Sequence, residues 1–303
     1  MMAEDIRLDP ARCPKCGSDS AREVAQGRDH LYGIPGTFRA TACSACGLWF
    51  QNPRPGPDQL DRIYPAHYGP HAGEPAASSA SSSPPAAAPV RRGAWDALAA
   101  RWLWRLEPRS YLARRLGYAH LPYEAGGVFR PSKWPLFDPA KRRAADLQLL
   151  PRFVPGGRLL EIGCATGNRL DLMRGLGWTD LHGIEMVDAA ARQARARGYA
   201  VQTGAVEDVL ASYADASFDV VVSSMVLEHL YNPFEVARAV ARKLKPGGQF
   251  LFSTICRDAR DARRYGPHWA GFDFPRHMVY FSRQDLRDML AADFEDVQLC
   301  HQT

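Results

Sequence analysis

The chain has 303 residues, of which 46% are hydrophobic and 23% charged, and its formal net charge at pH 7 is +5. That length accommodates one catalytic domain and a smaller module, and the hydrophobic fraction supports a packed core. The charge is too small to indicate a nucleic-acid partner by itself. No run of about eighteen or more apolar residues and no N-terminal signal segment is present, so we expect a cytoplasmic protein without a transmembrane segment.

Two cysteine pairs with the same spacing lie near the N-terminus. Cys13 and Cys16 form one C-x-x-C-G unit, and Cys43 and Cys46 form the other. Each unit places two thiolates on one tight turn, because the following glycine permits a positive φ angle there. Four thiolates leave no open coordination position on a metal ion. The sequence therefore predicts a structural zinc ribbon in residues 1–55, with a hairpin between the two pairs.

The next part of the chain changes composition sharply. Residues 56–93 include a stretch of Pro, Ala and Ser, which has little apolar surface to bury and predicts a flexible linker. Residues 94–139 form a connecting region, with a basic, tryptophan-containing helix followed by a proline-rich irregular segment. We favour packing of this helix on the protein core; a homodimer contact and an interfacial membrane helix are the alternatives.

From residue 140 onward, strand and helix patterns alternate. The predicted strands are 158–163, 180–185, 199–203, 218–223, 249–255 and 294–300, and the predicted helices are 140–150, 167–176, 188–197, 233–244 and 282–292. Strands separated by helices predict an α/β fold, Rossmann-like, with a mostly parallel sheet and helices on both faces, in a domain of residues 140–303. Ser282 and Asp285 have the spacing of a capping box at the start of the last helix, and Phe281 and Leu286 that of its hydrophobic staple.

A glycine-punctuated turn between the first strand and helix of this domain predicts a nucleotide site. The turn runs from Gly163 to Gly167, and by itself is typical of any Rossmann-like fold. Asn168 argues against a dinucleotide, whose fingerprint has a small residue at that position. Glu161 would sit badly beside a pyrophosphate and suits a cofactor that carries an ammonium and a sulfonium. Glu185, at the end of the second strand, has the spacing to accept hydrogen bonds from both hydroxyls of a ribose.

Together, these motifs resemble those of the class I S-adenosylmethionine-dependent methyltransferases, of the type 11/23 kind. The matching segments are 161–167, 183–185, 204–208, 217–222, 226–230 and 244–248. The resemblance implies that the glycine turn lies against the methionine part of S-adenosylmethionine. It also implies that Val206 and Glu207 lie near the adenine and that Ser224 and Met225 border the cofactor after the fourth strand. The predicted cofactor-binding residues are Glu161, Gly163, Cys164, Ala165, Gly167, Glu185, Met186, Val206, Glu207, Ser224 and Met225. Ala165 departs from the family pattern, because many relatives have glycine there.

The ribbon and the segment 269–277 give a narrower resemblance, to zinc-ribbon methyltransferases of glycan and secondary-metabolite pathways. This resemblance implies a small-molecule or glycan-type acceptor, with O-, N- and C-methylation all open. Members of the class usually close their sheet with a hairpin of two last strands. This sequence stops after the sixth, so we expect either a truncated chain or a missing seventh strand.

Two histidines are candidates for catalysis. Methyl transfer depends mainly on positioning, and a hydroxyl or amine acceptor also gains from a general base that titrates near neutrality. His229 follows the fourth strand, where acceptors sit in this fold, and His277 lies in an aromatic insert before the last helix. For each, the alternative is a hydrogen-bonded structural histidine; Glu228 is expected to be structural. Tyr64, with His67 and Tyr68, is a candidate for a second wall of the acceptor site.

Three other functions remain open. An RNA or DNA methyltransferase that binds nucleic acid through its ribbon is disfavoured, because the ribbon has few clustered Lys or Arg residues. A catalytically inactive scaffold is disfavoured by the intact Glu161 and Glu185. An NAD-dependent oxidoreductase is disfavoured by Asn168.

Overall fold

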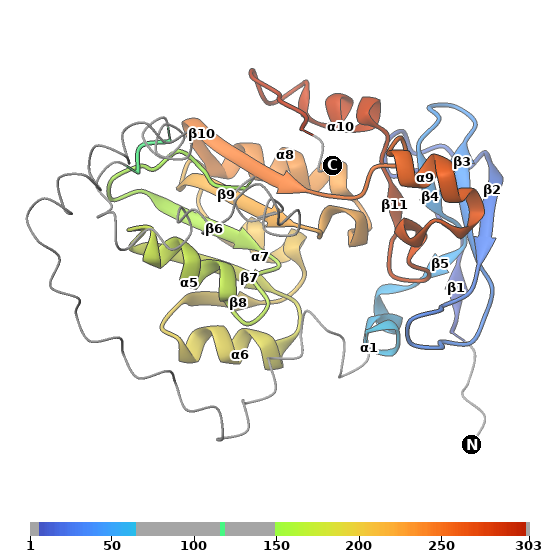
Figure 1. Ribbon diagram of the computed structural model, residues 1–303, viewed down its shortest axis with the longest axis horizontal. Helices are drawn as coiled ribbons and strands as arrows, with labels where there is room; N and C mark the ends of the chain where they lie inside the picture. Colours follow the sequence, from blue (N-terminus) through green and yellow to red (C-terminus); the bar gives the residue numbers. More distant parts are fainter. Residues whose placement is uncertain (1–5, 65–115, 119–148, 301–303) are drawn as a thin grey trace, which may run out of the picture.

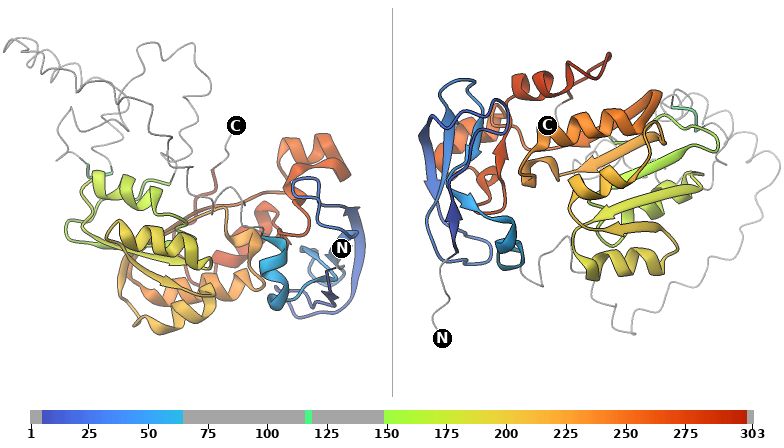
Figure 2. Two further views of the ribbon diagram at one scale, coloured as in Figure 1. Left: turned by 90° about the horizontal axis from the view of Figure 1, so that it is seen from below. Right: turned by 180° about the vertical axis from the view of Figure 1, so that it is seen from behind.

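The computed structural model describes residues 6–64, 116–118 and 149–300. The predictions for the linker, for His67 and Tyr68, and for almost all of 94–150 fall outside these residues. Figure 1 shows two parts: an α/β sheet covered by helices, and a small β ribbon beside it. In both figures the arrows of the central sheet point toward the ribbon, so the ribbon lies at the carboxyl end of the strands (Figure 2).

Five parallel strands form the central sheet, as predicted. They are β6 (Arg158–Ile162), β7 (Asp180–Glu185), β8 (Ala200–Thr203), β9 (Phe218–Ser224) and β10 (Leu244–Ser253). Their order is β10-β9-β6-β7-β8, so the chain moves outward from β6 to β8 and then crosses to β9 on the other side of β6. At such a reversal the loops at the carboxyl ends diverge and leave a crevice for a ligand.

Helices cover both faces of this sheet, which confirms the predicted Rossmann-like class. The helices are α5 (Asn168–Gly175), α6 (Asp188–Ala196), α7 (Val206–Ser212) and α8 (Pro233–Lys243). Because successive side chains of a strand point to opposite faces, Leu159 packs in the cluster of α5 and α6, and Leu160 in the cluster of α7 and α8. Helix α7 was not predicted, although its buried Val206, Val209 and Leu210 have helical spacing.

The ribbon consists of short antiparallel strands, with the expected hairpin between the cysteine pairs. Its strands are β1 (Leu8–Asp9), β2 (Ala21–Gly27), β3 (Phe38–Cys43), β4 (Trp49–Gln51) and β5 (Arg54–Pro55), followed by the short helix α1 (Leu60–Ile63). A further strand, β11 (Val279–Tyr280), comes from the other end of the chain. It pairs with β4 and so joins the sheet that β2, β3 and β4 form. No signal in the sequence indicated this pairing.

The insert between β10 and β11 packs on the ribbon rather than on the central sheet. It contains helix α9 (Arg260–Tyr265) and two short 3-10 turns. Its aromatic side chains Trp269, Phe272 and Phe274 share a buried cluster with Phe38 of β3. The insert and the ribbon therefore have one common core, built from residues more than two hundred positions apart.

The last helix, α10 (Arg283–Leu290), begins as predicted. Ser282 accepts a hydrogen bond from the backbone N–H of Asp285, whose side chain accepts one from the N–H of Ser282, and this completes the capping box. Phe281 and Leu286 of the predicted staple are both buried in the same cluster. No described helix has the length and the apolarity that crossing a bilayer requires.

The predicted strand 294–300 is wrong, because this segment forms no ladder with any described strand. Phe294, Val297 and Leu299 all pack on one core cluster. Phe294 and Val297 are an odd number of residues apart, so an extended strand would turn them to opposite faces. An irregular backbone buries all three, with the Phe294 ring 5.9 Å from that of Phe250.

Candidate active site and metal centre

The glycine turn after β6 is held in a shape that few side chains permit. Gly163 has φ 72°, and a Cβ there would lie 2.5 Å from Cγ2 of Val226. Ala165 also has a positive φ, 46°, which costs a non-glycine residue about 1–2 kcal/mol. This explains why glycine is common at that position in the family. Such strain is typical of ligand-binding turns.

Glu185 is fixed against this turn by two backbone hydrogen bonds. Its carboxylate accepts from the N–H of Ala165 at 2.8 Å and from the N–H of Val187 at 2.8 Å. The residue is only 3% exposed. The acidic side chain is therefore held at the carboxyl ends of β6 and β7 before any ligand arrives. This is the place that the sequence assigned to a ribose-binding carboxylate.

Glu161 is buried one residue before the end of β6 and has a cationic neighbour. Its Oε1 lies 3.2 Å from Nε of Arg169, in the first turn of α5. An ammonium group that binds Glu161 therefore shares the carboxylate with this guanidinium. Cys164 points into the core, 3% exposed, so it offers a ligand its backbone and not its thiol.

Two methionines stand out at the same edge of the sheet. Met186 is 39% exposed after β7, and Met225 is 47% exposed after β9, whereas most large apolar side chains of the described residues are buried. Ser224, beside Met225, has its Oγ 3.1 Å from Oγ of Ser253. Exposed thioethers at the mouth of a crevice offer an apolar surface for a nucleoside.

The remaining predicted cofactor residues lie along this edge as well. Gly167 caps α5, and Val206 and Glu207 open α7, with Val206 buried and Glu207 half-buried. All eleven residues that the sequence assigned to the cofactor thus lie at the carboxyl ends of β6, β7 and β9 or, after β8, in the first turn of α7. The structure therefore brings them together at one end of the sheet, the carboxyl end of its strands.

His229 and His277 meet at this edge, beside the ribbon. Their ring centroids are 4.6 Å apart and the rings are nearly perpendicular. Glu228, fully buried beside them, accepts a hydrogen bond at Oε2 from the Thr254 hydroxyl at 2.8 Å. Burial raises the pKa of Glu228, although His277 and the Thr254 bond favour its charged form. One potential ligand atom from each of Glu228, His229 and His277 lies within 4.8 Å of the others.

Both imidazoles are oriented through Nδ1. His277 Nδ1 lies 2.8 Å from the carbonyl oxygen of Gly271, and His229 Nδ1 lies 3.1 Å from that of Arg276. A carbonyl only accepts, so a hydrogen bond to it requires the proton on Nδ1, and Nε2 is then the basic nitrogen of the neutral ring. Tyr64 Oη lies 2.9 Å from His229 Nδ1, so this candidate for a second wall of the acceptor site lies beside the histidines. Sequence reasoning gave Thr254 and Gly271 no role, and their residue types carry no such signal.

A buried ion cluster joins this site to the ribbon. Arg276 is 0% exposed, and its two terminal nitrogens donate to Asp29 at 2.9 and 3.0 Å. One of these nitrogens also donates to Asp273 at 2.6 Å. Burial opposes the charge, but the hydrogen bonds that Arg276 donates to Asp29 and Asp273 outweigh it and raise the pKa of Arg276. Asp29 of the ribbon thus holds the side chain of Arg276, the residue that precedes His277 and whose carbonyl contacts His229.

Replacing Asp29 with Ala is expected to lower the free energy of unfolding of the ribbon and insert by about 3 kcal/mol, because it leaves a buried guanidinium with one carboxylate instead of two. Urea unfolding followed by tryptophan fluorescence measures the change, since Trp269 lies in the shared core. Asp19→Ala, at an exposed position of the same ribbon, is the matched control. If D29A lowers the free energy of unfolding no more than D19A does, Asp29 does not stabilise the ribbon and insert through Arg276.

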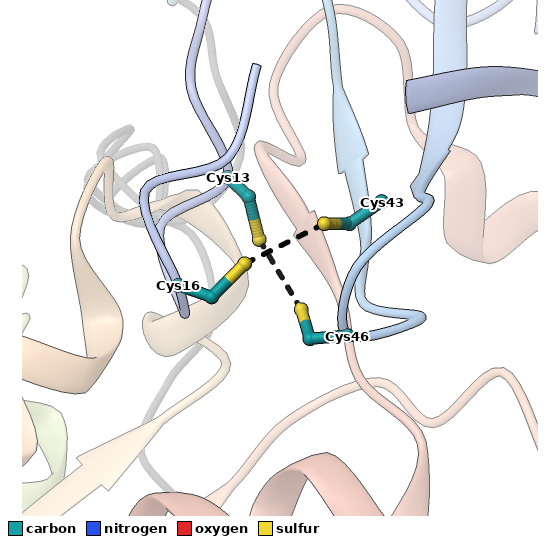
Figure 3. Close-up of side chains that lie close together, drawn as sticks. All are labelled: Cys13, Cys16, Cys43 and Cys46. Atoms are coloured by element: carbon teal, nitrogen blue, oxygen red, sulfur yellow. Dashed lines mark hydrogen bonds between the residues drawn. The ribbon is translucent and has the colours of Figure 1, made fainter. Parts of the chain in front are cut away.

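The four cysteines of the knuckles converge on one point (Figure 3). Sγ of Cys13 lies 3.5 Å from Sγ of Cys46, and Sγ of Cys16 lies 3.6 Å from Sγ of Cys43. A tetrahedral zinc ion with bonds of about 2.3 Å places its sulfurs about 3.8 Å apart, so the donor set fits. Gly17 and Gly47 both have φ 75°, which confirms the predicted turn geometry.

Comparisons with known proteins agree with this geometry. A family model described as "Methyltransferase domain" matches residues 139–299, more than half of the chain. A protein of Albidiferax ferrireducens named ubiquinone biosynthesis O-methyltransferase is 33% identical over 155 residues, which cover 49% of this chain and 59% of the relative. One with the same name from Thiobacillus denitrificans is 35% identical over 148 residues, covering 47% and 61%. The chain thus spans less than two thirds of each relative.

Two similar solved structures are described as methyltransferases. One from Thermotoga maritima, described as an S-adenosylmethionine-dependent methyltransferase and possible histamine N-methyltransferase, has 26% identity and a TM-score of 0.40, covering 48% of this chain and 66% of that one. Another, from Mesorhizobium loti, has 20% identity and a TM-score of 0.39, covering 46% and 74%.

Proposed function

This chain belongs to the class I S-adenosylmethionine-dependent methyltransferases, and from that premise we propose that it methylates an oxygen atom of a small-molecule acceptor. The observation that carries the proposal is the His229–His277 pair at the carboxyl end of the sheet, beside the residues assigned to the cofactor. A hydroxyl must lose its proton as the methyl group arrives, and imidazole is the side chain that accepts protons near neutrality.

Bound S-adenosylmethionine supplies an electrophilic methyl group on a sulfonium, and the side chains of this protein position it and remove the acceptor proton. The methyl group would pass in line to the acceptor oxygen, with the electron pair of the broken bond left on the sulfur, and Nε2 of His229 or His277 would take the acceptor proton. Glu228 stabilises the imidazolium that forms. The backbone carbonyls of Arg276 and Gly271 keep both rings in the tautomer that this step needs.

The relatives support oxygen as the acceptor atom, because the two described above are named O-methyltransferases. A phenolic hydroxyl and a sugar hydroxyl are both suitable acceptors for a site with two histidines. Incubation with ¹³C-methyl-labelled S-adenosylmethionine and a panel of catechols, phenols and nucleotide sugars tests this. An O-methyl resonance in the product supports the proposal, and transfer to nitrogen or carbon alone contradicts it.

We also propose that Glu185 binds the ribose of the cofactor. Replacing Glu185 with Ala is expected to weaken binding of S-adenosylhomocysteine at least about tenfold, because hydrogen bonds to a charged group contribute about 1.5–3 kcal/mol. Calorimetric titration measures the affinity of the wild type and the variant. Glu235→Ala, at an exposed position of α8, is the control and is expected to bind normally. Equal affinities in E185A and wild type would contradict this role.

Zinc is the metal that we propose for the four cysteines. Four converging thiols, two of them buried, match a closed structural site and offer no position for a substrate. In this position zinc would clamp the loop before β2 to the β3–β4 turn. Its role is then to hold the ribbon, and through the ribbon the insert that carries His277.

A further inference from the structure

One oxygen of the histidine site has no partner. Glu228 is fully buried, and its Oε1 makes no hydrogen bond, whereas Oε2 is held by Thr254. A buried carboxylate oxygen without a partner costs about 1–3 kcal/mol or more, so native structures rarely keep one without a reason. One carboxylate oxygen of Glu228 lies within 4.8 Å of a nitrogen of each imidazole.

The contacts around the three side chains follow the pattern of metal ligands. An imidazole that binds a metal through one nitrogen almost always donates the other N–H to a carbonyl or carboxylate. His229 and His277 both have Nδ1 on a backbone carbonyl, which directs Nε2 as the ligand atom. Glu228 is anchored in the same way, by the hydroxyl of Thr254.

The charges of the surroundings also favour a cation. Arg276 carries one positive charge, and it faces Asp29 and Asp273. Asp273 is also 3.8 Å from Nε2 of His277. With Glu228 ionised, as a metal ligand is, the described residues around the cluster hold three carboxylates against one guanidinium. A divalent ion would balance the difference.

We propose that Glu228, His229 and His277 bind one divalent transition-metal ion through one oxygen and two nitrogens. Three protein ligands leave open positions, which distinguishes a catalytic site from the closed four-cysteine site. The role of the ion rests on the proposed function: an acceptor hydroxyl bound at an open position loses its proton to solvent more easily. Its oxygen then attacks the methyl carbon, and the sulfur keeps the electrons of the broken bond. When the ion is bound, the two imidazoles act as its ligands and do not take the proton of the acceptor.

Manganese binding to the zinc-loaded protein tests the site. One equivalent of zinc is added first, because thiolates select it, and Mn²⁺, which prefers harder ligands, is then titrated. Electron paramagnetic resonance of free Mn²⁺ gives the stoichiometry, and we expect one ion per chain. Electron spin echo modulation of the bound ion is expected to show two imidazole nitrogens in the wild type.

Variants separate this site from nonspecific binding. H277Q is expected to bind Mn²⁺ at least about tenfold more weakly and to show one nitrogen, since even outer partners of metal ligands contribute that much. H268Q, at an exposed histidine of the same insert, is expected to bind as the wild type does. No binding, no nitrogen coupling, or equal binding by H277Q would overturn the cation site.

The same preparations distinguish this inference from the proposed function. Binding of S-adenosylhomocysteine and O-methylation need to be measured with and without Mn²⁺. Full methyl transfer without the ion would overturn its catalytic role and leave proton transfer to the imidazoles standing. Absence of methyl transfer in both preparations, with Mn²⁺ bound as described, would contradict the proposed function and leave the metal site standing.

Discussion

Protein from which zinc has been removed is expected to keep its affinity for S-adenosylhomocysteine and to lose methyl transfer. Zinc contributes about 10–16 kcal/mol to small thiolate sites, which is comparable to the whole stability of a domain, about 5–15 kcal/mol. The strands of the ribbon are short, and the loop that carries Cys13 and Cys16 meets the β3–β4 turn at the four sulfurs. We therefore expect the ribbon to unfold when the ion leaves.

The loss is expected to reach the active site through two described connections. β4 of the ribbon pairs with β11, two residues after His277, and Asp29 holds the side chain of Arg276. Without these contacts, the carbonyls that orient His229 and His277 have no fixed position. The Glu185 contacts lie within the central sheet and its loops, so the cofactor site does not depend on the ribbon.

Cys16→Ser and Cys300→Ser form the matched pair for this test. Cys16 is one of the four converging thiols, whereas Cys300 is an exposed thiol at the other end of the chain. Zinc content by atomic emission, calorimetric affinity for S-adenosylhomocysteine and the rate of methyl transfer are compared. We expect C16S to resemble the zinc-free protein and C300S to resemble the wild type. A zinc-free protein with full activity would refute the coupling.

The features that sequence predicted well are those that near neighbours along the chain determine. The knuckle at Cys43 and Cys46 closes because of the glycine that follows it, and the capping box needs only Ser282 and Asp285. The parallel sheet followed from alternating strand and helix patterns, each confined to a short window. Helix α7 carried a usable signal as well, in the spacing of its three buried apolar residues.

The features that sequence missed depend on contacts between distant residues. The pairing of Trp49 with Tyr280, and of Asp29 with Arg276, joins positions more than two hundred residues apart. A two-residue strand such as β11 has no periodicity to detect, and a single arginine does not reveal which carboxylate it faces. For this reason the two histidines were predicted as individual residues, whereas the contacts that hold them in place were not predicted.

Glu228 shows the same limit from another side. Next to His229 in the sequence, it was expected to be structural, because an acidic residue at a turn is usually solvated or pairs with backbone. Only the fold reveals that it is fully buried, that Thr254 holds one oxygen and that His277 lies beside it. The proposed chemistry of the site therefore involves a residue whose environment the local sequence did not determine.

Replacing His229 with Gln is expected to lower kcat by about 10²–10⁴-fold and to leave the affinity for S-adenosylhomocysteine nearly unchanged. Glutamine retains a donor for the carbonyl of Arg276 but has no nitrogen that accepts a proton near neutrality. Single-turnover methyl transfer measures the chemical step, and calorimetry measures cofactor binding. A variant with both properties altered equally would indicate a structural histidine, which is the alternative that the sequence left open.

The comparison with H268Q and Y64F sharpens this result. His268 is exposed in the same insert, so H268Q is expected to react at the wild-type rate. Tyr64 contacts Nδ1 of His229 but does not carry the reacting nitrogen, so Y64F is expected to lose less than H229Q does. If H229Q kept the wild-type kcat, neither proton transfer to the ring nor a metal ion bound by it would explain catalysis. If the loss of kcat is largest for H229Q, smaller for Y64F and absent for H268Q, the chemical step depends on Nε2 of His229 and on the contacts that orient it.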